Sequence, residues 1–83
     1  MFLLIELSTV SGATSQAMYP YSTEFEATAK FYQKMSGAMQ NVNYEEENLI
    51  IIDTDRNRII RAEKMDKPKP KAEISDDDVP ALG

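Results

Sequence analysis

Apolar side chains occupy both alternating sets of positions at the start of the chain, over residues 2–10. Successive side chains of a β-strand point to opposite faces, so Leu3 and Ile5 share one face while Phe2 and Leu4 share the other. Because both faces begin apolar, the pattern predicts a central strand or a well-covered one.

A second, shorter strand is expected over residues 16–21, after turn residues at 11–12. It carries Tyr19 and Tyr21 on either side of Pro20, which has no N–H to donate to a neighbouring strand. We therefore expect this strand at an edge of the sheet.

The firmest element of the pattern is a helix over residues 23–41. Thr23 is followed three residues later by Glu26, a capping box in which each side chain satisfies a free amide at the helix start. Side chains at helical spacing form one stripe, which consists of Phe25, Ala29, Tyr32, Ser36 and Met39. A further set widens it, namely Ala27, Phe31, Met35 and Ala38. Gly37 interrupts the helix at a cost of about 1 kcal/mol relative to alanine, so it predicts either a close neighbour or fraying.

A β-hairpin is predicted for the rest of the folded part. Residues 49–52 form a continuous apolar run, residues 55–57 are suited to a turn, and residues 59–65 return. Arg58 and Arg61 belong to the basic cluster of this hairpin, but their spacing places them on different faces of a regular strand, which weakens a phosphate-binding interpretation.

The turn also matches part of a calcium loop. Asp53, Asp55 and Asn57 stand at its first, third and fifth positions. Arg58 occupies the place of the glycine that such a loop needs, and Lys64 occupies that of the closing glutamate. A hairpin turn is therefore favoured, and no metal site is predicted.

These elements predict a small α+β domain over residues 1–65, with the order β-β-α-β-β and one helix packed on an antiparallel or mixed sheet. One helix covers one face only. The other face is expected to meet solvent or a partner, and its aromatic and aliphatic candidates for partner binding are Phe2, Leu4, Tyr19 and Tyr21.

Composition removes several classes of function. The 83 residues include no cysteine and no histidine, which excludes thiolate and imidazole catalysis and most transition-metal sites. We expect no enzymatic activity and no cofactor. The net charge of −5 argues against direct binding of nucleic acid. No run approaches about 18 apolar residues, so no membrane span is expected, and residues 1–7 resemble a strand more than a signal peptide.

Acidic residues gather in residues 45–47 and 76–78. Glu45, Glu46 and Glu47 precede the apolar run of the hairpin, where they form either a solvated loop or an acidic surface that imitates nucleic acid. The second group, Asp76, Asp77 and Asp78, follows a lysine-proline segment in residues 66–83, which we expect to be an extended, disordered tail.

The tip of this tail is similar to that of bacterial single-stranded DNA-binding proteins, in which aspartates precede an aliphatic residue, a proline and a terminal phenylalanine. Residues 76–80 match, and Val79 is the aliphatic residue. Ala81, Leu82 and Gly83 replace the terminal aromatic, so the hydrophobic anchor of that family is missing. Val79 and Leu82 remain candidate partner contacts of the tail, together with the three aspartates.

A strand at residues 2–10, a tyrosine-bearing strand at 19–21, an alanine-rich helix from Glu26-Ala27 through Tyr32 to Gly37-Ala38-Met39, and a hairpin at 49–63 follow one another. In this the chain resembles small uncharacterised α+β proteins encoded by bacteriophages. The resemblance implies an accessory or virion-associated protein, located in the host cytoplasm or in the virion.

Together these observations predict a non-enzymatic protein-protein interaction module that docks on a larger assembly or forms a homo-oligomer. The expected partner is a protein, either basic or part of that assembly. The alternative is a small acidic inhibitor that mimics nucleic acid and blocks a host defence or DNA-handling enzyme.

Overall fold

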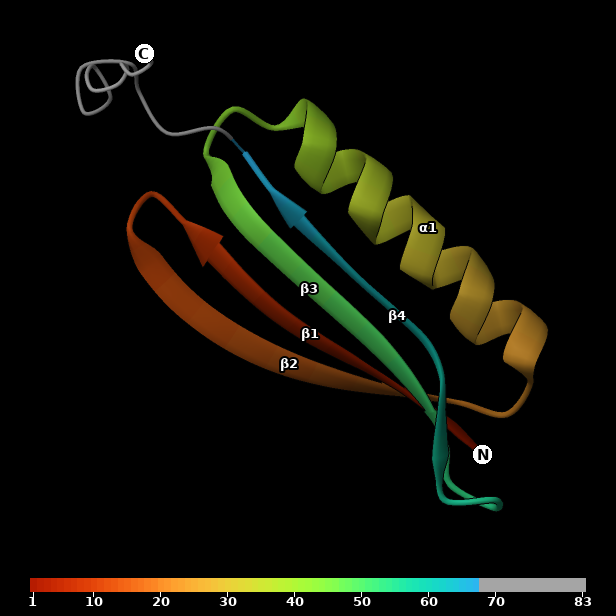
Figure 1. The fold of residues 1–83 in the computed structure, drawn as a ribbon. Helices are drawn as coiled ribbons and strands as arrows, with labels where there is room; N and C mark the ends of the chain where they lie inside the picture. Colours follow the sequence, from red (N-terminus) through yellow and green to blue (C-terminus); the bar gives the residue numbers. More distant parts are fainter. Residues whose placement is uncertain (68–83) are drawn as a thin grey trace, which may run out of the picture.

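The computed structural model describes residues 1–67 as a four-stranded sheet with one helix on it (Figure 1). The elements follow in the order β1 (Phe2–Val10), β2 (Ala13–Tyr21), α1 (Glu24–Gln40), β3 (Tyr44–Asp53) and β4 (Arg58–Asp66). This confirms the predicted two-layer β-β-α-β-β fold. The predicted tail lies outside the described residues from residue 68 onward.

The sheet has the strand order β2-β1-β3-β4, and every neighbouring pair is antiparallel. Two hairpins, β1–β2 and β3–β4, therefore lie side by side, and β1 and β3 form the centre. β2 is an edge strand, as Pro20 predicted, but it begins at Ala13 and not at residue 16. The β1–β2 turn consists of Ser11 and Gly12, whose φ angles of 50° and 86° are typical of the tight turn that matches strand twist.

α1 begins where its capping sequence predicted, but with only one half of the expected capping box, since the Glu26 carboxylate accepts from a hydroxyl and not from a backbone amide. The Thr23 side chain accepts a hydrogen bond from the Glu26 backbone N–H at 3.2 Å, and the Glu26 carboxylate accepts from the Thr23 hydroxyl at 3.2 Å. At the other end, the Asn41 backbone N–H donates to the carbonyls of Gly37 and Ala38. Both ends of the helix thus have partners for backbone groups that would otherwise be free.

The core lies between α1 and the sheet. Its helix side chains are Ala27, Phe31, Met35 and Ala38, and its strand side chains are Leu4, Leu49, Ile51 and Met65. The predicted stripe that includes Phe25 and Met39 is not the packed one, since these two side chains are 82% and 61% exposed. The set that was expected only to widen the stripe is the buried face, because it places Phe31 and Met35 over the apolar strands β1 and β3.

A β-bulge in β4 changes which side chains face the helix. Ile52 pairs with Ile59, but Ile51 pairs with Arg61, so Ile60 is an extra residue in β4. Arg58 pairs with Asp53, and Arg61 pairs with Ile51, so both arginines lie on the helix side of the sheet. Their predicted placement on different faces is wrong, because the extra residue between them shifts the alternation of side chains. The Arg61 guanidinium donates to the Tyr32 hydroxyl at 2.8 Å.

Candidate functional site

Four predicted partner-binding residues lie on the helix side of the sheet, and their predicted exposure on the open face is wrong. Leu4 is fully buried in the core, and Phe2, Tyr19 and Tyr21 pack against that core. Both faces of β1 are apolar, so either could have received the helix. The helix lies on the face that includes Leu4 of β1 and Leu49 and Ile51 of β3.

The opposite face of the sheet, which we call the uncovered face, carries no other element among residues 1–67 (Figure 1). Strand pairing divides its side chains into rows that cross all four strands in the order β2, β1, β3, β4. The first apolar row contains Pro20, Leu3, Ile52 and Ile59. The second apolar row contains Met18, Ile5, Ile50 and Ala62. Half of the uncovered face therefore presents eight neighbouring apolar side chains and no charge.

On the same face, the side chains become polar towards the β1–β2 turn. The mixed row contains Gln16, Leu7, Asn48 and Lys64, and the polar row contains Thr14, Thr9, Glu46 and Asp66. Lys64 and Asp66 form an ion pair of 3.3 Å. The uncovered face is thus graded, from wholly apolar at one end to charged at the other.

Exposure of these side chains is high for apolar residues. Met18 is 63% exposed, Ile59 is 59% exposed and Leu7 is 42% exposed. Ile5 and Ile50 at the centre are half-buried because their own neighbours shield them. Single exposed apolar residues are common, but a contiguous apolar patch marks an interaction surface.

The three glutamates of residues 45–47 do not form one acidic surface. Glu47 is fully buried under α1, and Glu46 lies opposite Thr9 on the uncovered face. Glu45 falls at an irregularity of the β1–β3 pairing and is exposed. Either a solvated loop or an acidic surface was expected for these residues. Instead, β3 begins at Tyr44, and strand alternation separates the three side chains.

A group of titratable side chains lies between α1 and the sheet. This group was not predicted from the sequence. The Glu6 carboxylate accepts hydrogen bonds from Lys34 at 3.2 Å and from the Tyr19 hydroxyl at 3.4 Å. The Lys34 ammonium also lies 4.4 Å from the centre of the Tyr19 ring. Glu47 lies beside Glu6, but neither of its carboxyl oxygens has a hydrogen-bond partner of good geometry in the described part of the chain.

These surroundings shift three pKa values. Burial, reinforced by the neighbouring Glu6 carboxylate, raises the pKa of Glu47 to about 8. Burial opposes ionisation of Glu6 as well, but Glu47, Lys34 and Tyr19 together hold the pKa of Glu6 below its usual range. For Lys34, burial is outweighed by Glu6 and Tyr19, which raise its pKa. At neutral pH Glu47 is therefore protonated while Glu6 is ionised and paired with Lys34.

Two carboxyl groups with separated pKa values are the usual components of acid-base catalysis. Here the Glu47 side chain has no exposed surface, and Glu6 is 8% exposed. A ligand in solvent therefore cannot contact the Glu47 carboxyl in this conformation. The arrangement affects stability and its pH dependence, and the uncovered face remains the candidate site.

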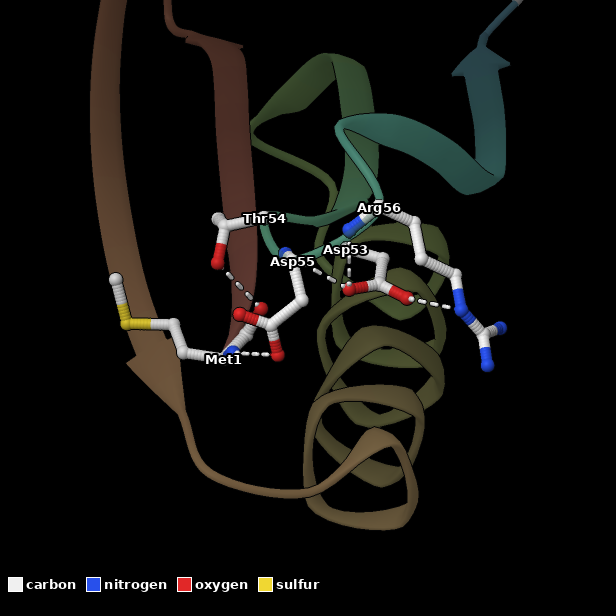
Figure 2. Close-up of polar contacts among 5 residues, drawn as sticks. All are labelled: Met1, Asp53, Thr54, Asp55 and Arg56. Atoms are coloured by element: carbon white, nitrogen blue, oxygen red, sulfur yellow. Dashed lines mark hydrogen bonds and ion pairs between the residues drawn. The ribbon is translucent and has the colours of Figure 1, made fainter.

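The β3–β4 turn holds the start of the chain against the sheet (Figure 2). The Thr54 side chain and backbone N–H both donate to the Met1 carbonyl, at 2.9 and 3.0 Å, and the Met1 amino group pairs with Asp55 at 3.1 Å. The Asp53 carboxylate accepts from the backbone N–H groups of Asp55 and Arg56. Asp53 thus stabilises a hairpin turn, and no group of acidic residues in residues 1–67 is arranged to hold a metal ion.

Asp76, Asp77, Asp78, Val79 and Leu82, the predicted contacts of the tail, lie outside the described residues. Comparisons of the chain with protein-family models, with curated proteins and with solved structures gave no match. α1, the helix of the described residues, is not long and apolar enough to cross a membrane.

Proposed function

We propose that this protein is a non-enzymatic interaction module that binds another protein molecule through its uncovered face, either by self-association or by docking on a larger assembly. The observation that carries the proposal is the pair of apolar rows, which cross all four strands without a charged residue. A chain that only needed to cover its core would be expected to place polar residues on the solvent side of an antiparallel sheet.

The sequence of β3 supports the same interpretation. Leu49 and Ile51 belong to the core, while Ile50 and Ile52 between them belong to the uncovered face. A continuous apolar run of this kind is typical of strands that are buried on both sides. The helix covers one side of β3, so the second side is suited to a partner.

The side chains of the uncovered face indicate what kind of surface a partner would need. The apolar half fits an aliphatic surface of similar size, and the charged end, with Glu46, Lys64 and Asp66, tolerates polar groups. An accessory or virion-associated role, in the virion or in the host cytoplasm, is part of this proposal, since it would supply an assembly on which the face docks. Because Glu47 is buried, residues 45–47 do not present the continuous acidic surface that an inhibitor mimicking nucleic acid would need from them.

Sedimentation of a labelled protein tests the proposal. A dye can be attached to Val42→Cys, since Val42 is 89% exposed in the α1–β3 loop and the chain has no other cysteine. We expect the labelled protein to sediment faster than a monomer, either in buffer or in an extract of the source cells. Adding Ile5→Asp at the centre of the uncovered face should restore the monomer in both.

Two results would contradict this function. One is a labelled protein that sediments as a monomer both in buffer and in extract. The other is a complex that Ile5→Asp leaves unchanged, provided that circular dichroism shows the variant to be folded.

A further inference from the structure

We infer that the occupant of the uncovered face is a second copy of this chain, related by a twofold axis that runs parallel to the strands between β1 and β3. This inference rests on the proposed function and adds the identity of the partner and the geometry of the dimer. Three properties of the uncovered face support it: its area, its strand order and the distribution of its charges.

The area of the uncovered face suits a stable dimer. Four strands about 4.8 Å apart, each with about nine residues at ~3.3 Å per residue, give a flat face of roughly 19 × 30 Å. The accessible area of the side chains on such a face exceeds its flat area of about 570 Å². Specific interfaces bury about 800 Å² per partner, so the whole face is needed, and half of it would be too small.

The strand order determines what each symmetry would bring together. Two sheets that pack face to face lie about 10 Å apart with strands inclined by about 30°, so the axis that relates them bisects this angle and lies about 15° from each strand direction. A twofold axis parallel to the strands places β1 over the partner's β3 and β2 over the partner's β4, because the order is β2-β1-β3-β4. The rotation does not change the position of a residue along the strand direction. Each row therefore faces the same row of the partner, with the order of its four residues across the sheet reversed.

The apolar rows are complementary to themselves under this rotation. In the second apolar row, Met18 lies over the partner's Ala62, so the longest side chain meets the smallest, and Ile5 lies over the partner's Ile50. In the first apolar row, Leu3 lies over the partner's Ile52. No apolar side chain of these rows has to face a charge.

The charged end is complementary as well. Lys64 lies over the partner's Gln16, Asp66 over the partner's Thr14, and Glu46 over the partner's Thr9. Each charged side chain of the uncovered face thus meets a neutral polar one. No like charges are placed directly opposite each other, which would disfavour association.

A twofold axis perpendicular to the strands fits less well. It reverses the strand direction, so full overlap would place Glu46 and Asp66 of the polar row on the partner's first apolar row. Both carboxylates would then be desolvated without a polar partner in the other copy. Sliding the copies until only the apolar rows overlap would cover about half of the face. The strand-parallel axis is the arrangement that covers every row without that cost.

Sedimentation equilibrium of the purified full chain is the first test, over a concentration series into the millimolar range. We expect a monomer-dimer equilibrium. Ile5→Asp should weaken the dimer more than about 100-fold, since it places one charge at the centre of the interface in each copy. Val42→Asp, an equally polar change at a residue that is 89% exposed outside the face, should leave the dissociation constant unchanged.

A matched pair of variants at Gln16 tests the geometry without disturbing the fold, since this residue is exposed on the edge strand. Gln16 lies opposite the partner's Lys64, but within its own chain the two residues are on opposite edges of the sheet. Gln16→Glu should tighten the dimer about three- to tenfold and Gln16→Lys should weaken it by a similar factor, because each substitution occurs twice per dimer. High salt should reduce both effects.

Crosslinking provides an independent test of which strands meet. Single-cysteine variants Met18→Cys and Ala62→Cys, mixed and treated with a short bifunctional thiol reagent, should give a crosslinked heterodimer. Each variant alone should crosslink poorly, because the axis lies between β1 and β3 and not at either edge. Met39→Cys, on the exposed side of α1, is the matched control for reaction by random collision.

The outcomes separate the dimer from the broader function. A purified chain that stays monomeric up to millimolar concentration, or a dimer that Ile5→Asp leaves intact, overturns the second-copy inference. If that same monomer becomes part of a larger particle in cell extract and Ile5→Asp prevents it, the proposed function stands with another occupant. A dimer that Gln16→Glu and Gln16→Lys affect equally, or that yields no Met18–Ala62 heterodimer, overturns the strand-parallel axis.

Discussion

Among the ionisable side chains of residues 1–67, Glu47 lies in the environment that is least favourable for a charge. Its side chain is fully buried, its carboxyl oxygens have no partner of good geometry there, and Glu6 lies beside it. A carboxylate in such a place would be strongly destabilising, and the protein avoids this by keeping Glu47 protonated. The consequence is a fold whose stability depends on the pH.

Stability is predicted to fall between pH 4.5 and about 8. The pKa of Glu47 rises from 4.5 to about 8 on folding, so the folded state binds more protons than the unfolded state within this range. The stabilisation is present in full below pH 4.5 and is lost as the pH rises through about 8. Glu47→Gln, which resembles the protonated side chain, should lie within about 1 kcal/mol of the original protein at pH 5 and exceed its free energy of unfolding by about 2–4 kcal/mol at pH 8.5.

Urea denaturation at the two pH values measures this difference. Glu46→Gln is the matched control, because Glu46 lies one residue away and its side chain is on the uncovered face and not under α1. An original protein as stable at pH 8.5 as at pH 5, or a Glu47→Gln variant with the same pH dependence, would contradict the protonation of Glu47.

At the scale of one residue, the sequence predicted neither that the three glutamates lie in β3 nor where their side chains point. Strand alternation decides that Glu47 is buried and Glu46 is not, and this requires knowing that β3 begins at Tyr44. The run of three glutamates has low β-propensity, which concealed the first part of the strand. Lys34 and Glu6 are 28 residues apart, so only the packing of α1 on β1 shows that they pair.

Among the elements, α1 shows most directly what local sequence determines. Thr23 and Glu26 predicted its start, since capping is a local hydrogen-bond problem. Which side of the helix is buried was predicted wrongly, because small and apolar residues occur around much of its circumference. That choice depends on the sheet, and the sequence of the helix alone does not contain it.

A substitution at Gly37 tests whether α1 is a regular helix up to its last turn. It lies in the last turns of the helix and is exposed, and a Cβ added there would meet no atom within 4 Å, so the predicted close neighbour is absent. Gly37→Ala should therefore stabilise the protein by about 0.5–1 kcal/mol through helix propensity and a less flexible unfolded chain. In a thermal melt this corresponds to a rise of about 3–6 °C in Tm.

The same substitution at Gly12 should have the opposite sign. Gly12 has a φ of 86°, which an alanine adopts only with strain, although space around it is open. We expect Gly12→Ala to destabilise the protein by about 1 kcal/mol.

For Gly37, a contradictory result is equally clear. A Gly37→Ala variant that melts at or below the temperature of the original protein would show that α1 is frayed at residue 37.

At the scale of the whole molecule, the order of elements could be predicted because each is encoded by a local pattern. The assignment of the two sheet faces could not, since β1 is apolar on both and the helix covers only one. Phe2 and Leu4 were expected to be exposed for this reason, whereas Leu3 and Ile5 are the residues that the helix leaves open. The ambiguity itself supports the proposed interaction, because the helix of residues 1–67 covers only one of the two apolar faces of the sheet.

The described residues alone should therefore be sufficient for both the fold and the dimer. The core side chains and the four rows described above lie within residues 1–67, and the Lys67 backbone N–H donates to the Glu45 carbonyl at 3.1 Å. A chain ending at residue 67 should keep the circular dichroism spectrum of the full chain. Removing residues 68–83 takes away four acidic residues and two lysines, which lowers the net repulsion between acidic copies. Its dimer, measured by sedimentation equilibrium, should be no weaker than that of the full chain, and a loss of folding or of dimerisation would show that residues 68–83 contribute contacts to the domain or its interface.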